Sequence, residues 1–226
     1  MSFHEFDLSA VPVRSLNAAL HADADGTFRV LEPGGRHAIA VGASGEAAVE
    51  IDGHVGYYCA GMNQLATVRI RGNCGVGVAE NMMSGKVVVE GDASQAAGAT
   101  AHGGLLRIDG NASARCAISL KGADVVVRGS VGHMSGFMAQ SGRLVVCGDA
   151  GDALGDSLYE ARIYVRGQVA GLGADCVEKQ LEDEHRAEVA ELLAEAGFED
   201  VEPSEFRRYG SARRLYNFDV NTAVAY

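Results

Sequence analysis

One glycine recurs every 19 residues through about half of the chain, and this repeat constrains the fold more than any other feature. Seven copies follow one another without an insertion or a deletion. The recurring glycines are Gly53, Gly72, Gly91, Gly110, Gly129, Gly148 and Gly167. A fixed period over many copies is typical of solenoids, in which each repeat forms one structural unit that stacks on its neighbours.

Two aliphatic columns accompany these glycines. The residue two positions before each glycine is always Ile or Val, and the residue four positions before is Val, Leu or Ile. The first column is Ile51, Ile70, Val89, Ile108, Val127, Val146 and Val165, and the second is Val49, Val68, Val87, Leu106, Val125, Leu144 and Ile163. Alternation with a period of two predicts a short strand with one buried face in every copy. Such a strand buries that face only when the copies stack.

A third column, seven residues after each glycine, contains only alanine or glycine. Its members are Ala60, Ala79, Gly98, Ala117, Gly136, Gly155 and Ala174. This restriction predicts a sharp turn or a close approach of two backbone segments. The columns together predict an all-β fold, a single-stranded parallel β-helix of about seven 19-residue coils. The alternative is a left-handed hexapeptide solenoid, which requires aliphatic residues every six positions and 18 residues per coil, and the 19-residue period disfavours it.

The segments on either side of the repeat are predicted to cap it. We expect residues 1–46 to form an N-terminal cap, with a possible degenerate first coil because Gly34 lies 19 residues before Gly53. This cap should contain an amphipathic helix and a strand, whose inward residues are Val13, Leu16 and Leu20 for the helix and Phe28 and Val30 for the strand.

Beyond the N-terminal cap, the solenoid should span residues 47–179, and residues 180–226 should form a capping helix and an aromatic tail. The helix pattern covers Val177–Ala196 and ends at Gly197, which is a C-cap signal. Because an open solenoid end exposes unpaired strand edges, we expect this helix to cover that end.

The composition excludes several classes of function. The chain has 30 acidic and 19 basic residues and a net charge of −11, which argues against binding to a nucleic-acid backbone. The sequence contains neither a membrane-spanning apolar segment nor a secretory signal. Its five cysteines are scattered, and no Cys-x-x-Cys occurs, so they are expected to be buried free thiols. We expect a cytoplasmic protein.

No catalytic constellation emerges from the sequence. The glycines match neither the dinucleotide-binding pattern nor the P-loop, and they are better explained as coil turns. Three histidines lie in the repeat, but His54, His102 and His133 follow their coil glycines by 1, 11 and 4 residues. Residues at such different positions of the coil point to different sides of the rod. We therefore expect no catalytic, cofactor-binding or metal-binding residue in this chain.

One outward column has the character of an interface. Three residues before the glycine, the early coils carry Glu50, Arg69 and Arg107, whereas later coils carry Val126, Val145 and Tyr164. An apolar strip on an outward face commonly marks an interface, so these three residues are the candidate docking site for a partner. The alternative is that the C-terminal tail covers the strip with Phe206, Tyr209 or Tyr216.

The repeat resembles the GXGXG domain of glutamate synthase large subunits, which also occurs as one of the chains of formylmethanofuran dehydrogenase. Two blocks that carry the resemblance run from Val68 to Gly77 and from Val125 to Gly132. The resemblance implies a right-handed β-helix. Within this family the chain looks most similar to the free-standing GXGXG chain of N-methylglutamate synthase, an enzyme that makes N-methylglutamate from methylamine and glutamate.

The resemblance implies a scaffold in a hetero-oligomer. The expected partners are an amidotransferase-like subunit and a glutamate-synthase-like subunit that holds FMN and an iron–sulfur cluster. The family's β-helix supplies no catalytic residue, so a non-catalytic subunit of the transferase complex is the leading hypothesis. Two alternatives remain: a structural component of a formyltransferase/hydrolase or formylmethanofuran dehydrogenase complex, and an independent enzyme with a site between coils.

Overall fold

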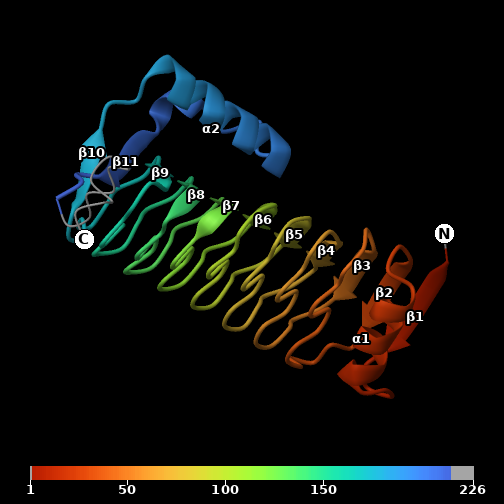
Figure 1. Ribbon diagram of the computed structural model, residues 1–226. Coiled ribbons are helices and arrows are strands. Elements are labelled where there is room, and N and C mark those ends of the chain that lie inside the picture. Colours follow the sequence, from red (N-terminus) through yellow and green to blue (C-terminus); the bar gives the residue numbers. More distant parts are fainter. Residues whose placement is uncertain (1, 215–226) are drawn as a thin grey trace, which may run out of the picture.

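The computed structural model describes residues 2–214 as a rod built of stacked coils (Figure 1). Seven strands follow the repeat and pair in parallel. They are β3 (Ala48–Asp52), β4 (Thr67–Ile70), β5 (Lys86–Val89), β6 (Leu105–Ile108), β7 (Lys121–Val127), β8 (Ser141–Val146) and β9 (Arg162–Val165). Their register keeps the 19-residue offset, so that Val49, Val68 and Val87 lie in one row. The predicted parallel β-solenoid of about seven coils is confirmed.

The interior of the rod is formed by the two aliphatic columns. All fourteen of their side chains are buried, with exposed fractions of 1% or less. Shortly after each strand, isolated parallel bridges connect successive coils at Val55, Cys74, Ala93, Ala112, Val131, Ala150 and Val169. Further backbone hydrogen bonds join the coils at their turns, as from the N–H of Tyr58 to the carbonyl oxygen of Val76 at 2.8 Å.

The small-residue column marks a turn in six of the seven coils, Ala174 of the last coil being the exception. Ala60, Ala79 and Ala117 have φ values of +54°, +56° and +58°, and Gly98, Gly136 and Gly155 have φ values of +68°, +71° and +64°. This is the left-handed region, which large or branched side chains disfavour. The predicted sharp turn is confirmed.

Polar side chains at the position after the coil glycine connect one coil to the next. The side chain of Asn73 accepts a hydrogen bond from the backbone N–H of Asp92, and Asp92 accepts one from the N–H of Asn111. The same contact recurs through Asn111, Ser130 and Asp149. These side chains satisfy backbone donors that the short strands leave unpaired.

The N-terminal segment extends the same sheet. It contains β1 (Phe3–Asp7), α1 (Val13–Ala22) and β2 (Thr27–Leu31), and both strands continue the parallel sheet next to β3. The predicted helix and strand are both present, with Leu16, Leu20, Phe28 and Val30 buried. Phe28 pairs with Val49, an offset of 21 residues, and Phe3 pairs with Thr27, an offset of 24, so the coils at this end are longer than the 19-residue coils of the repeat.

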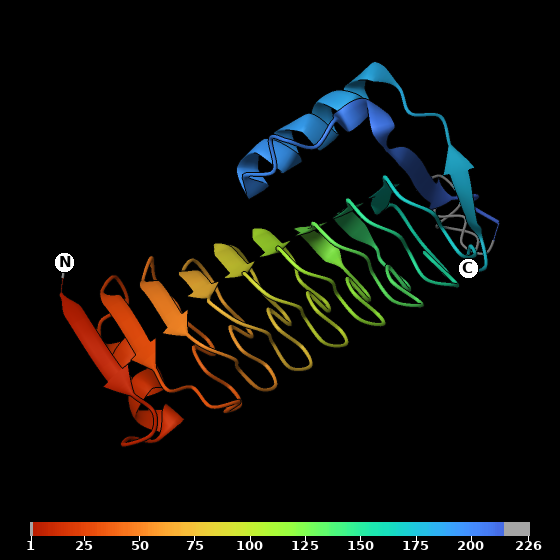
Figure 2. The same ribbon diagram turned by 180° about the vertical axis from the view of Figure 1, so that it is seen from behind.

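The C-terminal segment differs from the prediction. Cys176–Lys179 forms strand β10, and helix α2 spans only Asp183–Ala196 before the short 3-10 helix η1 (Pro203–Glu205) and strand β11 (Arg207–Ser211). Strand β11 pairs antiparallel with β9 and with β10, so these strands cover the last coil edge. Helix α2 instead lies along the side of the rod and runs back over earlier coils (Figures 1 and 2). The expected position of the helix at the open end is wrong, whereas its predicted C-cap at Gly197 is confirmed by a φ of +73°.

No helix within residues 2–214 is long and apolar enough to cross a membrane.

Candidate functional site

The predicted outward strip is covered by the protein's own C-terminal segment. Val126, Val145 and Tyr164 do point away from the solenoid core, but each has an exposed fraction of 0%. They belong to a second apolar cluster with residues of the helix and of the chain that follows it. Its C-terminal members are Val189, Leu192, Leu193, Ala196, Phe198, Val201 and Phe206. The strip is therefore an intramolecular docking surface for α2 and not a free surface for a partner.

The alternative covering by the aromatic tail is correct only in part. Phe206 lies in the second cluster, whereas Tyr209 packs against the solenoid core at its end. Tyr216 lies outside the described residues. Most of the residues that cover the strip belong to helix α2. The three residues of the strip did not indicate in the sequence which segment would cover them.

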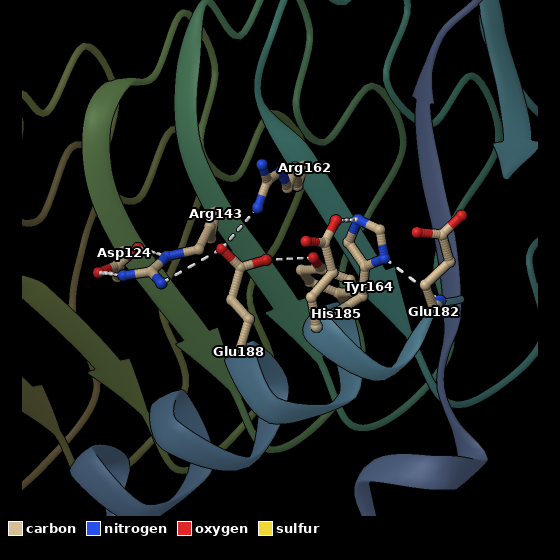
Figure 3. A network of polar contacts seen from close by, with 8 residues as sticks. Asp124, Arg143, Arg162, Tyr164, Glu182, His185 and Glu188 are labelled. Carbon is tan, nitrogen blue, oxygen red and sulfur yellow. Dashed lines mark hydrogen bonds and ion pairs between the residues drawn. The ribbon is translucent and has the colours of Figure 1, made fainter. Parts of the chain in front are cut away.

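A polar network connects α2 to the strands beside this cluster (Figure 3). The carboxylate of Glu188 on α2 accepts hydrogen bonds from Arg162 Nη1 at 2.9 Å and from the hydroxyl of Tyr164. Arg143 Nη1 lies 3.4 Å from the same carboxylate. Since the side chain of Glu188 is only 15% exposed, two arginines and a phenol surround a largely buried charge.

This environment shifts the pKa values of both partners. Burial alone would raise the pKa of Glu188, but the hydrogen bonds from Tyr164 and Arg162 and the charges of both arginines outweigh it. The pKa of Glu188 therefore lies below its ordinary value. Burial, followed by the hydrogen bond to Glu188, raises the pKa of Tyr164 well above its ordinary range. Glu188 is thus ionised and Tyr164 is neutral at physiological pH.

Arg143 is fixed from its other side by Asp124. Both oxygens of Asp124 bind the guanidinium, with Nε and Nη2 at 2.6 Å, which is the bidentate geometry of a strong ion pair. Residues five before the coil glycine supply Asp124, Arg143 and Arg162 on three successive coils. This run of charges in one outward column is the sequence signal for the network. The network itself was not predicted from the sequence.

A depression of about 340 Å³ lies beside the network. It is lined by Gly122, Asp124, Ser141, Gly142, Arg143, Glu160, Arg162 and Glu188. Its two arginines are already bound to Asp124 and Glu188. Because both cations have partners within the chain, the arrangement holds α2 in place against the strands.

The far end of α2 is held by contacts with Phe198. The guanidinium groups of Arg107 and Arg128 lie 4.8 Å and 5.0 Å from the centre of its ring. Arg128 also forms a two-pronged ion pair with Asp200, with distances of 3.0 Å and 2.6 Å. Cation–π contacts and an ion pair therefore hold the segment after α2 against the coils that contain strands β6 and β7.

A separate apolar surface lies at the opposite half of the rod. The exposed large hydrophobic residues among those described are Phe3, Tyr57, Tyr58, Met62, Leu65, Met83 and Leu172. Five of them fall within residues 57–83. Tyr58 and Met62 line one depression of about 170 Å³ together with Val41, and we call these three residues the N-terminal apolar patch.

The structure does not gather the three repeat histidines into one group. His54 accepts a hydrogen bond at Nδ1 from the N–H of Asn73, so it belongs to the polar contacts between coils. Within residues 2–214, the one cluster of potential metal ligands is formed by Glu182, Glu184 and His185. His185 Nδ1 already accepts a hydrogen bond from the N–H of Glu182 as part of the α2 capping box. Capping of the helix therefore explains why these side chains lie close together.

All five cysteines are buried and free, as the sequence predicted. Burial raises the pKa of Cys74, Cys116 and Cys176 to about 12 and that of Cys147 to about 11. A thiol with such a pKa is not a nucleophile at neutral pH, because the reactive form is the thiolate.

The fold and these contacts define the class of protein as a parallel β-solenoid with a helix docked along its side. The chain is 60% identical over 224 residues to a protein named GlxC from Rhizobium meliloti (strain 1021), covering 97% of this chain and 98% of that protein. It therefore belongs to the GlxC family. No protein-family model matches the chain.

Proposed function

We propose that this GlxC-family chain is a non-catalytic structural subunit of a glutamate-synthase-like complex. The complex is N-methylglutamate synthase, which converts methylamine and glutamate into N-methylglutamate and ammonia. In this proposal the 19-residue repeat is a GXGXG domain, as its resemblance to that family implies. The partners are an amidotransferase-like subunit and a second protein that carries FMN and an iron–sulfur cluster, in the cytoplasm.

The N-terminal apolar patch carries the proposal. Met62 is 52% exposed and Tyr58 is 48% exposed on a coil whose interior is already filled, and both line the same depression. Isolated apolar residues on a surface are ordinary, but neighbouring ones that line a depression mark a site for another protein. The exposed tyrosines and methionines are also residue types that are enriched in interfaces.

The resemblance and the site chemistry support the same role. Burial raises the pKa of the cysteine thiols, and the arginines beside α2 are occupied by carboxylates of the same chain. A scaffold needs a stiff surface and needs no reacting group of its own. The flavin and the iron–sulfur cluster therefore belong to the partner in this proposal.

The test is co-purification with the products of the neighbouring genes. Met62→Glu should remove the partner subunits from a tagged preparation while the isolated chain keeps its melting temperature, because Met62 is exposed. Ser119→Glu is the matched control, since Ser119 occupies the same coil position three coils further on and lies outside the patch.

Three results would oppose the proposal. Retention of both partners by Met62→Glu would show that the patch is not the interface. Partners typical of formylmethanofuran dehydrogenase would favour the second family assignment. Turnover of methylamine and glutamate by the isolated chain would make it an independent enzyme.

A further inference from the structure

A second depression, of about 180 Å³, lies where the C-terminal strands close the rod. Strands β10 and β11 meet the last coil there (Figure 1). Four of its ten lining residues are cationic, namely Arg162, Lys179, Arg208 and Arg213, and one is acidic, namely Glu160. Such a gathering of positive charge stands out in a chain whose net charge is −11.

Two of these cations oppose each other directly. Lys179 on β10 and Arg208 on β11 are paired residues of the antiparallel ladder. Like charges in this position destabilise a sheet, since directly opposed side chains leave the same face. The stem of Lys179 lies over Gly210, where an added Cβ would be 3.4 Å from Lys179 Cε. Because Gly210 has no side chain, the side chain of Lys179 has room beside Arg208.

Arg208 is only partly satisfied within the described chain. Its Nη1 donates to the backbone oxygen of Gln180 at 3.1 Å. Its Nε is buried and has no hydrogen-bond partner among residues 2–214. A buried unpaired donor is destabilising, and more so when it is charged, so the guanidinium of Arg208 is not fully satisfied by the described chain.

The other two cations already have carboxylate partners. Arg162 donates to Glu188, and Arg213 Nη2 donates to Glu160 at 2.8 Å. Among residues 2–214, neither Lys179 nor Arg208 forms an ion pair with a carboxylate. Lys179 and Arg208 are thus the two cations of the pocket without a carboxylate partner, and an anion between them would balance their charge.

We propose that this pocket binds a small oxyanion, with the carboxylate or phosphate oxygens held by the cationic groups of Lys179 and Arg208. Arginine and lysine are the usual partners of these groups. The volume is below the range of about 300–1,000 Å³ typical of pockets for drug-sized ligands, so the ligand is a small molecule and not a nucleotide. This site is independent of the proposed scaffold function and of the N-terminal apolar patch.

The experiment titrates the full chain with inorganic phosphate and, separately, with succinate, at constant ionic strength held by sodium chloride. Isothermal calorimetry should give saturable binding with one site per chain, and the melting temperature should rise with the anion. Tighter binding of phosphate would identify a phosphoryl ligand, and tighter binding of succinate a carboxylate ligand.

Two variants locate the site. Lys179→Gln and Arg208→Gln should each weaken binding at least tenfold, and Lys179→Gln remains informative if Arg208→Gln does not fold. Arg14→Gln is the matched control, because Arg14 is an exposed cation on α1 at the other end of the rod. Its affinity should stay within twofold of the unmodified chain.

The proposal is wrong if neither anion binds more strongly than chloride, or if Lys179→Gln binds as well as the unmodified chain. A third result would also overturn it. If small anions do not bind but Lys179→Gln loses a protein partner, the pocket is a contact for an acidic protein segment.

Discussion

The coil glycines are required by close approach between coils. An added Cβ at Gly110 would lie 2.7 Å from the backbone oxygen and 2.8 Å from the backbone carbon of Gly91 in the preceding coil. Gly72, Gly129 and Gly148 have backbone neighbours at similar distances. Backbone atoms in a stacked coil cannot move away without breaking the ladder, so the restriction to glycine is steric.

Gly110→Ala should therefore destabilise the protein by about 3 kcal/mol, at the upper end of the usual cost of overpacking. Gly35→Ala is the comparison, because Gly35 has a φ of +70° but nothing within 4 Å of an added Cβ. It should cost only about 1 kcal/mol for the left-handed backbone. Urea unfolding followed by circular dichroism measures both values. Equal losses would show that the coils are not tightly stacked at Gly110.

At the scale of the element, α2 is held by a charged contact within an apolar interface. Glu188→Gln should lower the free energy of unfolding by about 2 kcal/mol at pH 7, because it removes a charged acceptor from Arg162 and Tyr164. Glu191→Gln on the exposed face of α2 is the control and should have almost no effect.

The pH dependence follows from the pKa of Glu188. This pKa is lowered in the folded chain, so the contribution of the ionised carboxylate is present above its ordinary value of 4.5 and is lost as the pH falls through the folded value. The difference in melting temperature between the unmodified chain and Glu188→Gln should shrink as the pH is lowered from 7 to 3. A difference that is constant over this range would contradict the role of the ionised form.

The apolar part of the α2 interface gives a separate prediction. Val145→Glu should lower the free energy of unfolding of the isolated chain by about 4 kcal/mol, since it places an unpaired charge beneath α2. Leu65→Glu makes the same kind of change at an exposed position and should leave thermal unfolding nearly unchanged. If Val145→Glu melted like the unmodified chain, α2 would not cover this strip in solution.

At the scale of the whole molecule, the coil is the unit of folding. Deletion of residues 54–72 removes one complete period and keeps every remaining side chain on its own face, so the shorter rod should fold. Deletion of Val88 alone shifts β5 by one residue and turns its buried side chains outward, so that protein should be insoluble. Soluble expression and circular dichroism compare the two deletions. Equal behaviour would show that stacking register does not control folding.

Local patterns were sufficient to predict the rod. The two aliphatic columns, the coil glycines and the small-residue column all lie within one 19-residue period, and stacking repeats that period. Leu16, Leu20 and the C-cap at Gly197 were likewise visible as local helix signals. These features were predictable because each depends on residues that are near one another in the sequence or one period apart.

Tertiary structure alone decided what happens outside the repeat. Val177 reads as the start of a helix, yet it pairs with Gly210 in a sheet, because a partner strand 33 residues later supplies its hydrogen bonds. The apolar strip indicated a cover, but the path of the chain after the last coil determined that α2 provides it. Glu188 meets Arg162 across 26 residues for the same reason. The sequence by itself determined the coils, whereas the pairing of non-repeating segments depended on contacts that have no period.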